Sequence, residues 1–133
     1  MKPLPLKSLL IFSCLVLGLS SCKKEEGSDG VLIRVRNGST YSFTALVVQN
    51  SRQGGLASYG ALAPGQISGY TPHTEAYSYS YAKATINGKD VSFVPDDYVG
   101  EKLLEPGRYT YVVEVINQAD GTPKSLWVRL ERP

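Results

Sequence analysis

The chain has 133 residues, with 14 Lys plus Arg against 12 Asp plus Glu. Lys2 and Lys7 lie near the N-terminus, and without these two the numbers of basic and acidic residues are equal. Nucleic-acid binding requires a clustered basic face, and a balanced net charge carries no argument for one, so we expect no nucleic-acid partner. The length allows one domain with one hydrophobic core.

Residues 1–21 have the order of parts that is typical of a secretory signal. Lys2 and Lys7 give a positive start, Leu9 to Leu19 form an apolar run, and Ser20 and Ser21 are small. As a helix, the apolar run would span roughly 17 Å, well short of the ~30 Å hydrocarbon core of a bilayer. We therefore expect residues 1–21 to be removed as a signal peptide and not to span a membrane permanently.

The sequence Leu19-Ser20-Ser21-Cys22 resembles the cleavage and acylation site of bacterial lipoproteins. The tail that follows, Cys22-Lys23-Lys24-Glu25-Glu26, is similar to the lysine-plus-acidic export signal of Bacteroidota-type outer-membrane lipoproteins. The resemblance implies a lipid on Cys22, the membrane as a partner through that lipid, and a place on the outer membrane that faces the exterior. Several acyl chains would anchor the protein stably where one would not. The alternative is a secreted protein in which Cys22 is incidental.

Residues 22–30 are expected to be a flexible linker. After Cys22 this stretch has no apolar residue, and it mixes charges with glycine. Cys14 would leave with the signal and Cys22 would carry the lipid, so no thiol would remain for a disulfide, a metal site or a nucleophile. Residues 31–133 must then be held together by packing alone.

From Val31 onward the hydrophobic pattern has a period of two, which indicates strands. Expected strands are 31–36, 41–49, 56–62, 66–71, 76–86, 89–94, 108–117 and 125–131. Asn87-Gly88 predicts a type I′ hairpin turn, and Ala63-Pro64-Gly65-Gln66 predicts a type II turn. No window has a helical period. The sequence therefore predicts an all-β domain over 31–133, a single antiparallel β-sandwich of about seven or eight strands.

The stretch Leu104-Glu105-Pro106-Gly107-Arg108-Tyr109 precedes a predicted strand. It resembles the L-x-P-G-x-Y element of transthyretin-like and other immunoglobulin-like modules. The resemblance implies an immunoglobulin-like or transthyretin-like sandwich, with the exact superfamily open, and it implies no particular activity.

Few residues have the chemistry of a catalytic or metal site. His73 is the single histidine. With Glu75 it would supply two ligands, whereas a catalytic zinc takes three, so we expect a solvated polar loop there. The acidic residues Asp96, Asp97, Glu101 and Glu105 lack the spacing of a calcium loop. We expect no catalytic residue, no metal ion and no cofactor.

Tyrosine is abundant, with nine Tyr against three Phe and one Trp. Tyr77, Tyr79 and Tyr81 alternate within the predicted strand 76–86 and would line one of its faces. If they point outward, they form a candidate binding platform for a sugar ring or a protein partner, because each ring has an apolar body and a polar tip. If they point inward, they belong to the core.

The expected function is a non-catalytic, lipid-anchored binding or structural module of the cell envelope. Its partner would be a glycan, a peptide or an envelope protein. One alternative is an accessory subunit of a surface fibre, since Bacteroidota-type fimbrial proteins resemble lipidated transthyretin-like sandwiches. A second alternative is an enzyme with a site of unfamiliar type.

Overall fold

The structure is a computed structural model that describes residues 30–49, 55–96 and 101–131. These residues contain eight strands and no helix, and thus no helix that could cross a membrane. The strands are β1 (Val31–Asn37), β2 (Ala45–Gln49), β3 (Leu56–Ser58), β4 (Thr71–His73), β5 (Tyr81–Ile86), β6 (Lys89–Phe93), β7 (Gly107–Asn117) and β8 (Pro123–Glu131).

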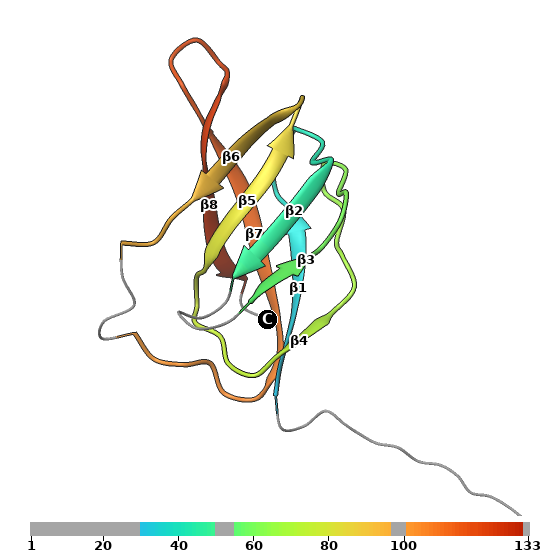
Figure 1. The fold of residues 1–133 in the computed structure, drawn as a ribbon, viewed down its shortest axis with the longest axis vertical. Helices are drawn as coiled ribbons and strands as arrows, with labels where there is room; N and C mark the ends of the chain where they lie inside the picture. The colour runs from blue at the N-terminus through green and yellow to red at the C-terminus, as the bar shows by residue number, and fades with distance from the viewer. Residues whose placement is uncertain (1–29, 50–54, 97–100, 132–133) are drawn as a thin grey trace, which may run out of the picture.

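The strands form two four-stranded sheets that pack face to face (Figure 1). The first sheet has the order β4-β1-β7-β8 and the second has the order β3-β2-β5-β6. The predicted β-sandwich is therefore confirmed. One detail differs from the expectation of antiparallel pairing, because β1 and β7 run parallel, from Val31 opposite Gly107 to Asn37 opposite Val113. Side chains alternate in the same way along both kinds of strand, so the period of two cannot reveal strand direction.

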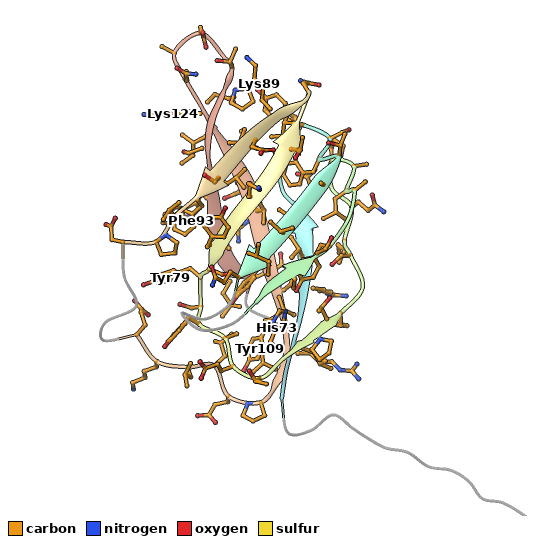
Figure 2. All side chains as sticks on the ribbon, viewed as in Figure 1. His73, Tyr79, Lys89, Phe93, Tyr109 and Lys124 are labelled. Carbon is orange, nitrogen blue, oxygen red and sulfur yellow. The ribbon has the colours of Figure 1, made fainter. Side chains whose placement is uncertain are left out.

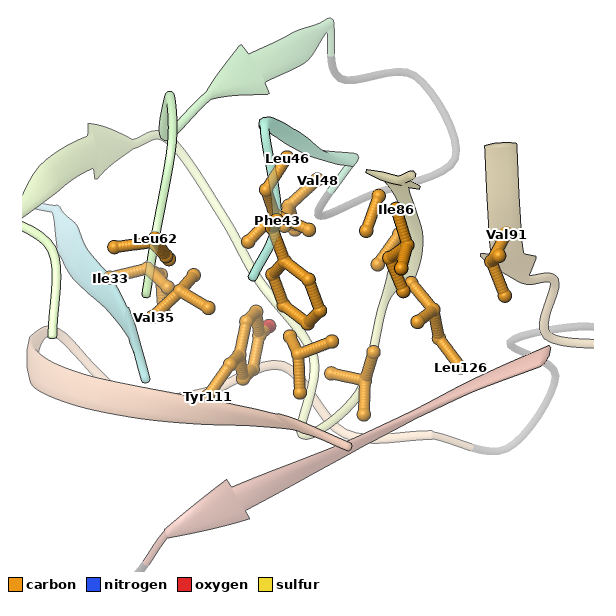
Figure 3. Packing of buried hydrophobic residues seen from close by; sticks show 14 of the residues in the cluster. Ile33, Val35, Phe43, Leu46, Val48, Leu62, Ile86, Val91, Tyr111 and Leu126 are labelled. Atoms are coloured by element: carbon orange, nitrogen blue, oxygen red, sulfur yellow. The ribbon is translucent and has the colours of Figure 1, made fainter. Parts of the chain in front are cut away.

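The core lies between the sheets and is built from the alternate side chains of each strand. In β1, Val31, Ile33 and Val35 are buried, and the side chains between them face outward. The largest fully buried side chains are Tyr111 and Phe43, whose rings point toward one another in Figure 3. Packing of apolar side chains between two sheets is the arrangement expected of a sandwich.

Both predicted turns are present. Asn87 and Gly88 have φ values of 52° and 80°, as the type I′ turn between β5 and β6 requires. Gly65 has a φ of 79°, and the amide of Gln66 donates to the carbonyl of Ala63 at 3.0 Å, which closes the predicted turn at Pro64.

The segment between β3 and β4 departs from the prediction. The expected strand 56–62 ends at Ser58, and the expected strand 66–71 is replaced by β4, which begins at Thr71. Leu62 makes an isolated bridge with Phe43, and Ile67 makes one with Arg36 of the other sheet. The chain thus passes from one sheet to the other, and it cannot pair continuously with either.

The Leu104–Tyr109 element forms a turn that leads into the first residues of β7. The hydroxyl of Tyr109 donates to the carbonyl oxygen of Glu105 at 2.7 Å. A tyrosine that bonds back to the backbone a few residues upstream is the tyrosine-corner arrangement of many β-sandwiches. This contact fixes the entry of the chain into the first sheet.

Asn37 is a fully buried polar residue at the end of β1. Its Nδ2 donates to the carbonyls of Tyr41 at 2.7 Å and Leu62 at 3.0 Å, and its Oδ1 accepts from the amide and hydroxyl of Ser39. All of these groups belong to loops, so Asn37 holds the loops at this end of the sandwich to the first sheet.

Candidate ligand-binding site

The three tyrosines do not share one strand. β5 begins at Tyr81, and the chain bends at Ser78 and Tyr79 before it. The prediction that Tyr77, Tyr79 and Tyr81 line a single strand face is therefore wrong. All three are half-buried, as is Ser78, whereas five neighbouring residues are at most 2% exposed: Ala76, Ser80, Ala82, Ala84 and Ile86. In β5, Ala82, Ala84 and Ile86 face the core, and Tyr81 lies on the opposite side of the strand.

Tyr79 belongs instead to a group of rings from three parts of the chain. Its ring lies edge-on to Phe93, with centroids 6.5 Å apart, and Phe93 lies edge-on to Trp127 at 5.3 Å. We call Tyr79, Phe93 and Trp127 the aromatic cluster. Phe93 ends β6 and Trp127 lies in β8, and these are neighbouring edge strands of the two sheets. The cluster therefore covers the seam between the sheets, and Figure 2 labels Tyr79 and Phe93 there.

Trp127 is the exposed member of the cluster. Its side chain is 46% exposed and projects from the outer face of β8, directly opposite Glu114 of β7. Two hollows meet at this ring. One has a volume of about 810 Å³ and includes Tyr79, Phe93, Asp96 and Arg129 in its walls.

The second hollow has a volume of about 450 Å³ and lies toward the loop after β1. Ser39, Tyr41, Glu114 and Asn117 contribute to its walls, and Trp127 is shared with the larger hollow. Both volumes are in the range of small-molecule sites, about 300–1,000 Å³. We call the two hollows and the ring between them the Trp127 site.

Polar groups surround the indole ring. Arg129 Nε lies 3.3 Å from Glu114 Oε2, and both side chains are partly exposed. An ion pair this open contributes little to folding stability, about 0–1 kcal/mol. The ion pair can therefore open at small cost in free energy, so that Arg129 and Glu114 bond to a ligand instead of to each other. The site combines a flat apolar ring with hydrogen-bonding groups at its edge.

Part of this site could be recognised from the sequence. The alternation in 125–131 places Trp127 on the face opposite Leu126 and Val128, which are buried, and an outward tryptophan is a recognisable candidate. The contacts of Trp127 with Phe93, and of Phe93 with Tyr79, join residues that are distant in sequence. Only the arrangement of the two sheets brings them together.

His73 lies in β4, in place of the solvated loop that the sequence predicted, and it is half-buried. Its Nε2 is 3.1 Å from the Tyr59 hydroxyl, which also donates to the carbonyl of Ile33 at 3.2 Å. Burial raises the pKa of Tyr59 to about 12, against a smaller opposite effect of its hydrogen bond with Thr71. Tyr59 is therefore an uncharged phenol that links the two sheets.

The residues weighed as metal ligands in the sequence analysis do not form a cluster within the part of the chain that the structure describes. Within the described ranges, no group of three or more His, Cys, Asp or Glu side chains is placed to hold a metal ion. Asp97 of the acidic stretch lies outside the described residues, as does Cys22.

Burial lowers the pKa of His73 below its ordinary 6.5. A group with a lower pKa in the folded than in the unfolded state binds fewer protons when folded. Its contribution to stability is thus fully present above about pH 6.5 and is lost as the pH falls through the folded pKa. We expect the free energy of unfolding to fall more steeply between about pH 7 and pH 5 in the wild type than in His73→Gln. Urea titrations at both pH values measure the free energy of unfolding. An equal change between the two pH values in both proteins would contradict the prediction.

Comparisons with known proteins inform the fold. No protein-family model matches the chain, and no curated protein matches it. The chain is similar to the NMR structure of a protein from Eubacterium rectale, with a TM-score of 0.55 and 11% sequence identity. The match covers 84% of this chain and 97% of that chain. At this identity the likeness concerns the fold alone.

Proposed function

We propose that the protein is a non-catalytic, lipid-anchored module of the cell envelope that binds carbohydrate at the Trp127 site. The observation that carries this proposal is the exposed indole of Trp127, which Phe93 supports from the side between two hollows. A large aromatic ring that is 46% exposed presents apolar surface to water, and covering that surface is favourable.

The surroundings of Trp127 suit a sugar. The apolar face of a sugar ring can stack on the indole, while its hydroxyl groups bond to charged side chains at the edge. Glu114 supplies acceptors and Arg129 supplies donors beside the indole. Phe93 restrains the indole in advance, so binding would cost little side-chain entropy.

The position of the site agrees with a tether at Cys22. The eight residues from Cys22 to Gly30 can reach at most about 29 Å, and Gly30 enters the sandwich beside Gly107, whose amide donates to its carbonyl at 3.2 Å. Glu114 lies seven residues further along β7, about 24 Å from that entry. The tether would thus leave the Trp127 site on the part of the domain away from the lipid surface.

The fibre alternative would require a terminal strand that can leave the fold. β1 lies between β4 and β7, and the inward side chains of the terminal strand β8, Leu126 and Val128, are 1% exposed. Withdrawing either strand would uncover the core, so these observations favour the binding module.

The test uses Trp127→Ala and affinity electrophoresis in gels that contain soluble β-glucan, xylan, mannan or polygalacturonate. We expect at least one polysaccharide to retard the wild-type protein. Loss of a central aromatic contact typically costs about 2 kcal/mol or more, so the variant should bind at least about tenfold more weakly.

Leu56→Ala is the matched control, because Leu56 is a 60% exposed apolar residue at the edge of the other sheet. It should bind as the wild type does. Equal retardation of wild type and Trp127→Ala by every polysaccharide that binds would refute the proposal.

A further inference from the structure

Positive charge gathers on the outer face of the first sheet, although the chain after residue 21 has balanced charge. Four arginines face outward there, Arg34 and Arg36 from β1, Arg108 from β7 and Arg129 from β8, against Glu114 and Glu131. Arg36 pairs with Glu131, and Arg129 pairs with Glu114. Among the described residues, Arg34 and Arg108 form no ion pair with a carboxylate.

Arg34 and Arg108 share one aromatic ring. Their guanidinium carbons lie 5.0 Å and 5.6 Å from the centre of the Tyr70 ring, which precedes β4 and is 39% exposed. The Nε of Arg34 donates to Thr110 Oγ1 at 2.9 Å, which fixes the side chain and involves none of its terminal nitrogens. We call Arg34 and Arg108 the arginine pair.

Two positive charges at one ring repel each other, and cation–π contacts at an exposed site are weak and offset only part of this repulsion. A negatively charged group between them would remove the repulsion. Guanidinium groups offer parallel N–H donors that match the two oxygens of a carboxylate or sulfate. The arginine pair therefore has the charge and the donors of an oxyanion site.

The arginine pair and the Trp127 site lie on the same sheet face. Arg108 and Glu114 are six residues apart in β7, so their side chains point to the same side and are separated by about 20 Å. Trp127 is the cross-strand neighbour of Glu114. A ligand that reached both would be an extended chain, longer than a single sugar.

We propose that the arginine pair binds the carboxylate or sulfate groups of an acidic polysaccharide. This inference rests on the proposed carbohydrate function and specifies its ligand class. An anionic membrane surface has similar chemistry, but recognition of anionic lipids typically takes clusters of about four to eight basic residues. Arg36 and Arg129 of this face are paired with carboxylates, so the arginine pair supplies the two remaining arginine charges, on a face that continues to Trp127.

The experiment compares two forms of one polymer, polygalacturonate and its fully methyl-esterified, uncharged form. Binding to the mature protein in nonionic detergent is measured at low salt by biolayer interferometry. Arg34→Gln/Arg108→Gln is the test variant, and Arg108→Gln alone is a milder version because Arg108 is exposed. Lys89→Gln/Lys124→Gln is the matched control, since it removes two exposed positive charges near the hairpins at the other end of the sandwich (Figure 2).

We expect the wild type to prefer the charged polymer. The test variant should bind it at least about tenfold more weakly, because it loses charge-assisted hydrogen bonds, which are stronger than neutral ones. Arg108→Gln should show part of that loss, and the lysine control should change affinity less than about twofold. Thermal melting checks that each variant is folded. Dextran sulfate serves as a second probe for a sulfate-specific site.

The outcomes separate this inference from the proposed function. Binding of polysaccharide that depends on Trp127 and not on the arginine pair would overturn the inference and leave the proposed function intact. Binding of acidic polymer that depends on the arginine pair and not on Trp127 would support the inference and contradict the Trp127 site. Failure of both acidic polymers to bind would overturn the inference, as would arginine-dependent binding to phosphatidylglycerol vesicles alone.

Discussion

Replacement of Tyr111 by alanine is expected to lower the free energy of unfolding by about 3–5 kcal/mol. Tyr111 is fully buried in β7, its ring packs in the core with Phe43, and its hydroxyl donates to the carbonyl of Tyr77. The substitution would leave a large cavity and remove the hydrogen bond to Tyr77. Small domains have a total stability of about 5–15 kcal/mol, so the loss would be a large part of it. Urea denaturation followed by circular dichroism measures the change.

Tyr111→Phe is the matched control, because it keeps the ring and removes only the hydroxyl. We expect it to cost about 1 kcal/mol, the usual value of one hydrogen bond. A large loss in both variants would assign the stability to the hydrogen bond with Tyr77 and not to packing. Equal denaturation midpoints for wild type and Tyr111→Ala would contradict the buried position of the ring.

Replacement of Cys22 by alanine is expected to abolish attachment to the membrane. The lipoprotein resemblance places the lipid on the sulfur of Cys22, and alanine offers no atom to carry it. An anchor of several acyl chains is lost completely with its attachment point, because each buried methylene contributes about 0.8 kcal/mol. Membrane fractionation of cells that express the variant should recover a soluble or uncleaved protein.

Cys14→Ala provides the control, since Cys14 lies in the apolar run of the signal segment and is expected to be removed. This variant should remain in the membrane fraction. If cleaved Cys22→Ala protein also stayed in that fraction, another part of the chain would hold it there, and the lipoprotein interpretation would be wrong.

Much of the fold could be predicted because its signals are local. Val31, Ile33 and Val35 alternate with Leu32, Arg34 and Arg36, and this pattern indicates both the strand β1 and its buried face. Asn87 and Gly88 tolerate positive φ, so they define the hairpin of β5 and β6 without reference to the rest of the chain. The hydrogen bond of Tyr109 likewise closes within its own turn.

The predicted strand bounds were wrong where the residues that pair with a segment are distant from it in sequence. The segment from Tyr59 to Tyr70 has turn and strand signals, but its bridges go to Phe43 in one case and to Arg36 in the other. Tyr77 and Tyr79 alternate as strand residues do, but strand pairing of β5 with β2 begins only at Tyr81. A local period cannot show where a partner strand ends.

The sequence by itself determined which side chains share a face of each strand, because alternation is a property of the strand backbone alone, and where one face is clearly more apolar it also indicated the buried face. It therefore set the outward directions of Trp127, Arg34 and Arg108. The tertiary structure decided what these side chains meet, namely Phe93 beside Trp127 and Tyr70 beside both arginines. Those neighbours depend on strand order, strand direction and the closure of the two sheets. These in turn are fixed by the packing of the whole core, and no short stretch of sequence contains that information.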